Sequence, residues 1–179
     1  MILIRNIHQN NYSYMQIRLT SSIVSAYAGS DGNIRWEGIA NITVTSEDNP
    51  LNSTDHAFRI VDQGNIPGEE GKKGVLGLTP LGENVIYLSN HILDRTQATE
   101  GENTGTGKTE NGKGTLERTG THESGHSANL KHPAKGTMDG NLMHQTKRPN
   151  AGMKLTKEQI LQIKKDYNDK KLNRGKQTK

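Results

Sequence analysis

The segment that decides the fold is residues 122–132, which read His-Glu-Ser-Gly-His-Ser-Ala-Asn-Leu-Lys-His. Residues four apart in a helix lie on one face, so His122 and His126 can direct two imidazole nitrogens at one zinc ion. Glu123 lies about 100° further around such a helix, where its carboxylate can reach a water on that ion without being a ligand. The segment therefore predicts a zinc-binding helix with a proton acceptor beside the metal.

The third histidine of the segment requires the helix to end. His132 lies six residues beyond His126, too far along a straight helix to reach the same ion. Asn129 is placed where a turn is needed, because Asn tolerates the left-handed conformation that ends helices, and Pro133 prevents the helix from resuming. Three histidines leave a position open for water, whereas structural zinc sites usually have four protein ligands. A catalytic site is favoured, and a closed structural zinc site or a metal-free polar helix are the alternatives.

These residues resemble the zinc signature of the metzincin metallopeptidases, H-E-x-G-H-x-x-G-L-x-H. The matching positions are His122, Glu123, Gly125, His126, Leu130 and His132. The sequence departs from the signature at Asn129, where the family usually has glycine. Both residue types tolerate the left-handed turn, so the departure is compatible with the same local structure.

Metzincins also carry a methionine in a tight turn beneath the metal. The resemblance assigns this role to Met143, eleven residues past the last signature histidine. Met138 is less suitable, because the Asp-Gly pair after it is typical of a separate turn. Certain metzincins have a tyrosine two residues past the turn methionine, and here that position is Gln145.

The resemblance implies an α+β fold of zincin type, with a mixed five-stranded sheet, a long zinc-binding helix and a small C-terminal helical subdomain. Residues 1–179 would form a single catalytic domain. Within it, residues 1–132 would be an upper subdomain with the sheet and the zinc helix. Residues 133–179 would be a lower subdomain with the methionine turn and the closing helix.

The resemblance also implies a zinc-dependent endopeptidase. One Zn²⁺ would be held by His122, His126 and His132, and Glu123 would take a proton from the water that attacks a peptide carbonyl. Met143 would form an apolar floor beneath the histidines. An extended substrate would pair its backbone with an edge strand, for which residues 75–79 are the candidate.

Apolar spacing leaves one segment with two interpretations. Met15, Ile17 and Leu19 alternate as in a strand, but Met15, Leu19, Ile23 and Tyr27 recur every four residues over a longer window. The longer pattern favours a helix over residues 13–28.

The remaining elements are predicted from β-branched runs and turn residues. Strands are expected at residues 2–7, 34–45, 56–62, 75–80 and 84–89. We expect a bend at Gly38, and Pro80 indicates a strand end or an edge. Thr115 is the expected N-cap of the zinc helix, and Thr156 with Gln159 predicts a capping box for a closing helix. Residues 97–114 are expected to form a low-complexity surface loop rather than a phosphate-binding loop, because no apolar helix follows.

The amino-acid composition limits the classes of protein to which this chain can belong. Apolar residues make up 30% of the chain and aromatic residues 4%, with 20 glycines, so we expect a thin core that the metal helps to stabilise. The absence of cysteine excludes disulfides and a cysteine-based latency mechanism. No apolar run approaches the length of a membrane span. Much of the net charge of +4 lies in residues 164–179, which favours a solvated helix end over a nucleic-acid-binding arm.

These features predict a monomer that acts on a protein or peptide substrate, with neither nucleic acid nor a membrane as partner. We expect a secreted or exported protein whose signal is absent from this chain, and a bacterial toxin or effector module is a narrower form of this hypothesis. The alternatives are a catalytically silent binding module with the zincin fold and a basic nucleic-acid-associated protein. His8, His56 and His91 are interpreted as surface or packing residues, and His144 as a neighbour of the site.

Overall fold

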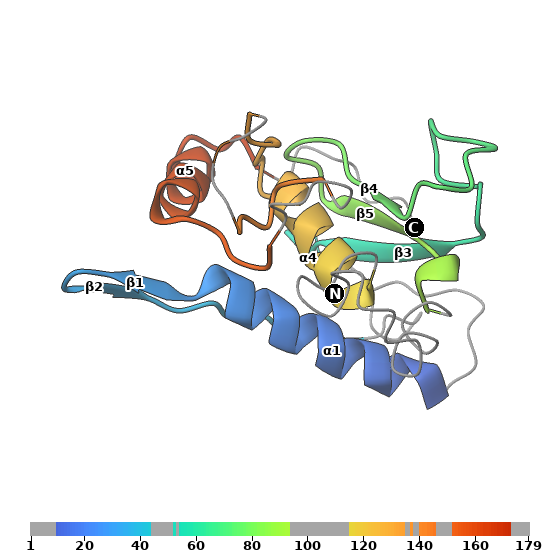
Figure 1. Ribbon diagram of the computed structural model, residues 1–179, viewed down its shortest axis with the longest axis horizontal. Coiled ribbons are helices and arrows are strands. Elements are labelled where there is room, and N and C mark those ends of the chain that lie inside the picture. The colour runs from blue at the N-terminus through green and yellow to red at the C-terminus, as the bar shows by residue number, and fades with distance from the viewer. Residues whose placement is uncertain are drawn as a thin grey trace.

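The described part of the chain mixes helices and strands, as expected for an α+β fold (Figure 1). The computed structural model describes residues 10–43, 52, 54–93, 115–134, 137, 140–145 and 152–172. In chain order the elements are α1 (Asn10–Tyr27), β1 (Gly29–Asp31), β2 (Ile34–Trp36), β3 (Ala57–Val61), β4 (Gly77–Leu78), β5 (Val85–Ser89), α4 (Leu116–Ser127) and α5 (Lys157–Asn168). The predicted strand at residues 2–7, His8 and the low-complexity segment at 97–114 lie outside the described residues.

The larger sheet has the strand order β3-β5-β4. β3 pairs with β5 in parallel over the register Ala57↔Val85 to Val61↔Ser89, and β4 pairs with β5 antiparallel. The strands predicted at residues 56–62 and 84–89 are confirmed as β3 and β5. The strand predicted at 75–80 is shortened to β4, which lies at an edge of this sheet, the position that Pro80 indicated.

The expectation of one five-stranded sheet is wrong for the described residues, because β1 and β2 form a separate two-stranded sheet. β1 pairs antiparallel with β2, with Asp31 opposite Ile34, across a two-residue turn in which Gly32 has a φ of +55°. Hairpin turns of this length need a positive φ, which glycine adopts without steric cost. The hairpin thus folds the chain back on itself directly after α1. β2 ends at Trp36, far short of the predicted end at Thr45. Gly38 lies against the backbone of α1, because a Cβ added there would be 2.4 Å from the Val24 carbonyl oxygen.

Helix α1 confirms the four-residue periodicity of residues 13–28. Met15 and Leu19 are buried, whereas Ile17, which only the strand pattern would place with them, is 66% exposed. The main core joins α1 to α4 and the larger sheet. Its buried members are Met15, Leu19, Phe58, Ile60, Ile86, Leu88, Ile92 and Leu116. Helix α4 thus lies between α1 and the sheet, and contacts both (Figure 1).

A second, smaller core lies where α1 ends and α5 begins. Its buried members are Ala26, Leu130, Leu142, Met143 and Leu155. Helix α5 starts with the predicted capping box between Thr156 and Gln159, and Ile160 and Ile163 pack against the cluster. Tyr167, near the end of α5, is 69% exposed. Among the described helices, none combines the length and apolarity needed to cross a bilayer.

Candidate metal centre

Helix α4 places two of the three signature histidines one turn apart. Thr115 is its N-cap, as predicted, and the Thr115 side chain accepts a hydrogen bond from the Arg118 amide. Gly120 allows α4 to approach α1, since an added Cβ there would lie 2.4 Å from Leu19 Cδ2. This close crossing explains a glycine that weakens the isolated helix. His122 and His126 then lie on the face of α4 that is turned away from α1.

The third histidine is delivered by a Schellman turn at the end of α4. The Leu130 amide donates to the Gly125 carbonyl over 2.9 Å and the Asn129 amide donates to the His126 carbonyl over 2.8 Å. Asn129 has a φ of +67°, the left-handed conformation that the sequence predicted for it. The chain therefore reverses after α4 and brings His132 back beside the helix.

The structure also accounts for asparagine at a position where the family signature has glycine. Asn129 Nδ2 donates a 2.8 Å hydrogen bond to the Asp166 carboxylate in α5. This bond ties the turn to the closing helix, which a glycine could not do. The departure from the signature thus keeps the backbone conformation and adds a side-chain contact.

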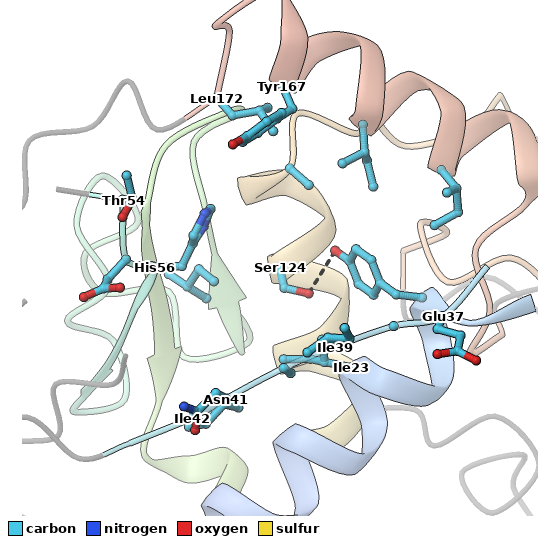
Figure 2. A pocket seen from close by; sticks show the side chains of 18 of the residues that line it. Ile23, Glu37, Ile39, Asn41, Ile42, Thr54, His56, Ser124, Tyr167 and Leu172 are labelled. Carbon is cyan, nitrogen blue, oxygen red and sulfur yellow. Dashed lines mark hydrogen bonds between the residues drawn. The ribbon is translucent and has the colours of Figure 1, made fainter. Parts of the chain in front are cut away.

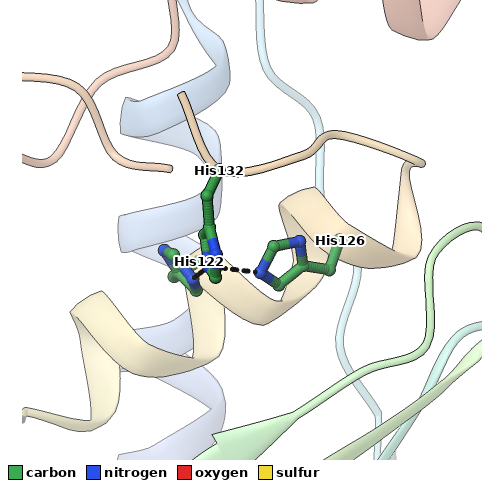
Figure 3. Close-up of side chains that lie close together, drawn as sticks. All are labelled: His122, His126 and His132. Atoms are coloured by element: carbon green, nitrogen blue, oxygen red, sulfur yellow. Dashed lines mark hydrogen bonds between the residues drawn. The ribbon is translucent and has the colours of Figure 1, made fainter. Parts of the chain in front are cut away.

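The three imidazole rings converge on one point (Figure 3). His132 Nε2 lies 3.1 Å from His122 Nε2 and 3.0 Å from His126 Nε2. His122 and His126 are buried, and His132 is exposed, so the group opens to solvent on the side of His132. In tetrahedral zinc sites with Zn–N bonds of about 2.0–2.1 Å, the ligand nitrogens are about 3.3 Å apart. The spacing of the rings is close to this value, and the three histidines could hold a metal ion.

Main-chain carbonyls define which ring nitrogens face the centre. His122 Nδ1 lies 2.8 Å from the Leu142 carbonyl oxygen, and His126 Nδ1 lies 2.7 Å from the Leu130 carbonyl oxygen. Because a carbonyl only accepts, each Nδ1 carries the hydrogen and each Nε2 presents a lone pair. A hydrogen on His132 Nε2 can be donated to the Nε2 atom of either His122 or His126, but not to both. A single cation can satisfy all three nitrogens.

The electrostatic surroundings keep the two helical histidines neutral. Burial, together with the neighbouring imidazole of His126, lowers the pKa of His122 to about 3. Burial likewise lowers the pKa of His126 to about 4. Neutral imidazole is the form that binds metals, so His122 and His126 have the protonation state that a metal requires.

Glu123 lies between α4 and the edge strand β4. A Cβ added to Gly77 in β4 would lie 2.8 Å from Glu123 Cγ and 2.9 Å from Thr119 Cγ2, so the strand runs directly over this side chain. Burial raises the pKa of the Glu123 carboxyl to about 8, while polar groups of Thr79 and the charge of Arg118 act in the opposite direction. Within the part of the chain that the structure describes, Glu123 Oε2 is buried without a hydrogen-bond partner.

Met143 lies against α4. Its side chain is fully buried, and an added Cβ on Gly125 would lie 2.3 Å from Met143 Sδ. The turn is shaped by Asn141, whose Oδ1 accepts a 2.8 Å hydrogen bond from the Met143 amide. Gly125, the second glycine of α4, thus makes room for Met143 against the histidine-bearing turn.

Among the described residues, His56, His91 and His144 do not join this group. His144 is buried, and its Nε2 donates to the Thr137 carbonyl over 2.6 Å. His56 Nδ1 lies 2.5 Å from Ser127 Oγ, a contact that packs the residue before β3 against α4. The contact of His56 agrees with its interpretation as a packing residue.

A cavity of about 610 Å³ lies on the other side of α4. His56 lines it together with Ser124, whose hydroxyl lies 3.2 Å from the Tyr27 hydroxyl (Figure 2). None of the three clustered histidines lines this cavity, so it is separate from the candidate metal centre.

The sequence analysis did not identify Arg118, which is fully buried in α4. Its Nη2 donates to the carbonyl oxygen of Leu142 over 3.0 Å and to that of His144 over 2.5 Å. Its spacing was the available signal, since it lies four residues before His122 and therefore on the same helix face. Thr79 was also missed, and no motif marks it.

No protein-family profile, curated protein or solved structure matches the chain.

Proposed function

We propose that this protein is a zinc-dependent endopeptidase of metzincin type. The observation that carries the proposal is the convergence of His122, His126 and His132 through Nε2 atoms, with Glu123 next to His122 in α4. Three imidazoles are a donor set that suits zinc, and three protein ligands leave a coordination position for substrate or water. Two further features agree with the resemblance to the metzincin sequence signature. Met143 packs against α4, and the chain turns at Asn129.

The chemistry divides between the metal and the chain. Zinc, when bound, supplies Lewis acidity that polarises a peptide carbonyl and lowers the pKa of water toward about 7. Glu123 accepts the proton of the attacking water and returns it to the departing amine. Its buried Oε2 supports this role, because the atom has no competing hydrogen bond within the described residues.

The edge strand β4 supports a peptide as the substrate class. β4 pairs with β5 on one side and ends the three-stranded sheet on the other, and it lies over Glu123. An extended peptide that added itself to this edge would place its backbone beside the carboxylate, and the pairing would be independent of its sequence. Side-chain selectivity would then come from the segments around the edge.

The second candidate is a zincin-fold binding module without turnover. One observation favours it: Gln145, at the position where certain metzincins have a tyrosine, is exposed. In this alternative the histidines still hold the metal, and peptides bind without being cleaved.

A comparison of two carboxylate variants tests the proposal. Zinc-loaded protein is expected to cleave a mixture of unstructured peptides, and Glu123→Gln should keep its zinc while losing at least about 100-fold in rate, in the range of a lost acid–base catalyst. Glu117→Gln, on the same helix but paired with Arg18, is the matched control and should retain cleavage. Equal cleavage by wild type and Glu123→Gln would contradict the mechanism. Zinc binding without cleavage by the wild type would favour the binding module.

A further inference from the structure

Arg118 is a charged side chain in the interior of a small protein. It has no exposed surface, and it reaches from α4 to two carbonyl oxygens that flank Met143, those of Leu142 and His144. Burial lowers the pKa of Arg118 to about 10, and the nearby charge of Glu123 opposes this shift. A buried guanidinium carries a desolvation cost that an apolar residue of similar size would avoid. Its hydrogen bonds therefore point to a positional role.

The Leu142 carbonyl connects Arg118 to the metal centre. This oxygen accepts from Arg118 Nη2 over 3.0 Å and from His122 Nδ1 over 2.8 Å. Arg118 and His122 are one turn apart on α4, so both reach the same point on the methionine turn. The carbonyl that fixes the His122 ring is thus itself held by Arg118.

We propose that Arg118 is a positioning residue that holds the Leu142 carbonyl where it keeps His122 in the tautomer with a free Nε2. This inference rests on the proposed role of His122 as a metal ligand. It adds that the methionine turn and the metal centre are coupled through one shared acceptor. Partners of this kind, which orient a ligating histidine, contribute about 10- to 100-fold to metal affinity.

The charge of Arg118 makes the inference testable, because loss of the charge and loss of the positioning would change metal affinity in opposite directions. A cation near the three histidines repels a divalent ion, so an effect of charge alone predicts tighter metal binding when Arg118 is neutralised. Loss of positioning predicts weaker binding. The two predictions differ in sign.

The first experiment uses metal-free protein and detects the tautomer of His122 by ¹H–¹⁵N NMR of the side-chain nitrogens. The wild type should show a hydrogen on His122 Nδ1 alone. Arg118→Met should show a mixture of Nδ1 and Nε2 forms, because Leu142 is no longer held. Arg18→Met is the matched control: Arg18 pairs with Glu117 at the start of α4, and its loss should leave the His122 tautomer unchanged.

The second experiment measures zinc affinity of the same variants. Arg118→Met should bind zinc about 10- to 100-fold more weakly than the wild type. Arg118→Lys keeps the charge but lacks the planar guanidinium, and should also weaken binding; it serves if Arg118→Met does not fold. An unchanged tautomer, or unchanged or tighter zinc binding in a folded Arg118 variant, would overturn the inference. Failure of the wild type to bind zinc would instead overturn the proposed function, and the tautomer would still report on Arg118.

Discussion

Helix α4 meets α1 through a close apolar crossing flanked by side-chain bonds such as that of Ser22 with Thr121. It meets the segments around the candidate metal centre through hydrogen bonds to main-chain carbonyls. On the α1 side, Leu19 fills the space that Gly120 leaves open, within the main core. On the other side, His122 and Arg118 share the Leu142 carbonyl, and His126 is bonded to that of Leu130. Packing contributes free energy in proportion to buried area, while hydrogen bonds fix orientation. The comparison teaches that stability and metal-site geometry should respond to different substitutions.

The largest expected effect on stability comes from the packed side. Leu19→Ala removes a fully buried side chain at the closest approach of α1 and α4. The free energy of unfolding should fall by about 3 kcal/mol, which chemical denaturation of the metal-free protein would measure. Zinc affinity of the protein that remains folded should change less than threefold, or about 0.6 kcal/mol. A larger loss of affinity would mean that the two faces are not separable.

The largest expected effect on catalysis comes from the edge strand. Gly77→Ala introduces a Cβ 2.8 Å from Glu123 Cγ, so the carboxylate or β4 must move. A misplacement of about 1 Å can reduce kcat/KM by about 100-fold, and zinc content should be unchanged, because Glu123 is not a ligand. Gly74→Ala is the matched control, since an added Cβ there meets nothing within 4 Å. Equal activity of the two variants would contradict the placement of Glu123 under β4.

A buried amide pair provides a smaller effect that touches both properties. Asn141 Nδ2 donates to Gln159 Oε1 over 2.7 Å, and Gln159 Nε2 donates to Asn141 Oδ1, which also accepts from the Met143 amide. Asn141→Ala removes the acceptor of Gln159 Nε2 and of the Met143 amide and should cost about 2 kcal/mol in stability. Because the methionine turn loosens, zinc affinity should fall as well. A change in thermal stability with unaltered zinc affinity would show that the turn does not orient the ligands.

The smallest expected effect concerns the turn after α4. Asn129→Gly keeps a residue that tolerates the observed φ of +67° but removes the bond to Asp166, and should cost about 1 kcal/mol. Asn129→Ala loses the same bond and adds about 1 kcal/mol of backbone strain. Thermal unfolding should therefore rank wild type above the glycine variant and the glycine variant above the alanine variant. The reverse order of the two variants would contradict a role for the left-handed conformation.

The local parts of this structure could be predicted from sequence because each depends on a short pattern. The convergence of three histidines follows from helix spacing plus one residue, Asn129, that permits a left-handed turn. The helix over residues 13–28 follows from a four-residue apolar repeat, and the start of α5 from a capping box.

The arrangement of strands could not be predicted in the same way. Pairing of β1 with β2 depends on a turn at Gly32 that also suits a simple loop, so sequence alone could not separate the hairpin from the larger sheet. Arg118 was missed for a related reason, since its partners are main-chain carbonyls of Leu142 and His144, which leave no mark on side-chain identity.

X-ray absorption at the zinc edge tests the central claim most directly. The protein, loaded with zinc and freed of excess metal, is predicted to hold one ion per chain with three imidazole nitrogens at about 2.0–2.1 Å and one oxygen ligand. His132→Ala should reduce the imidazole count and release the ion on dialysis. Zinc that stays bound with an unchanged spectrum in His132→Ala, or a wild type that retains no zinc, would contradict the account.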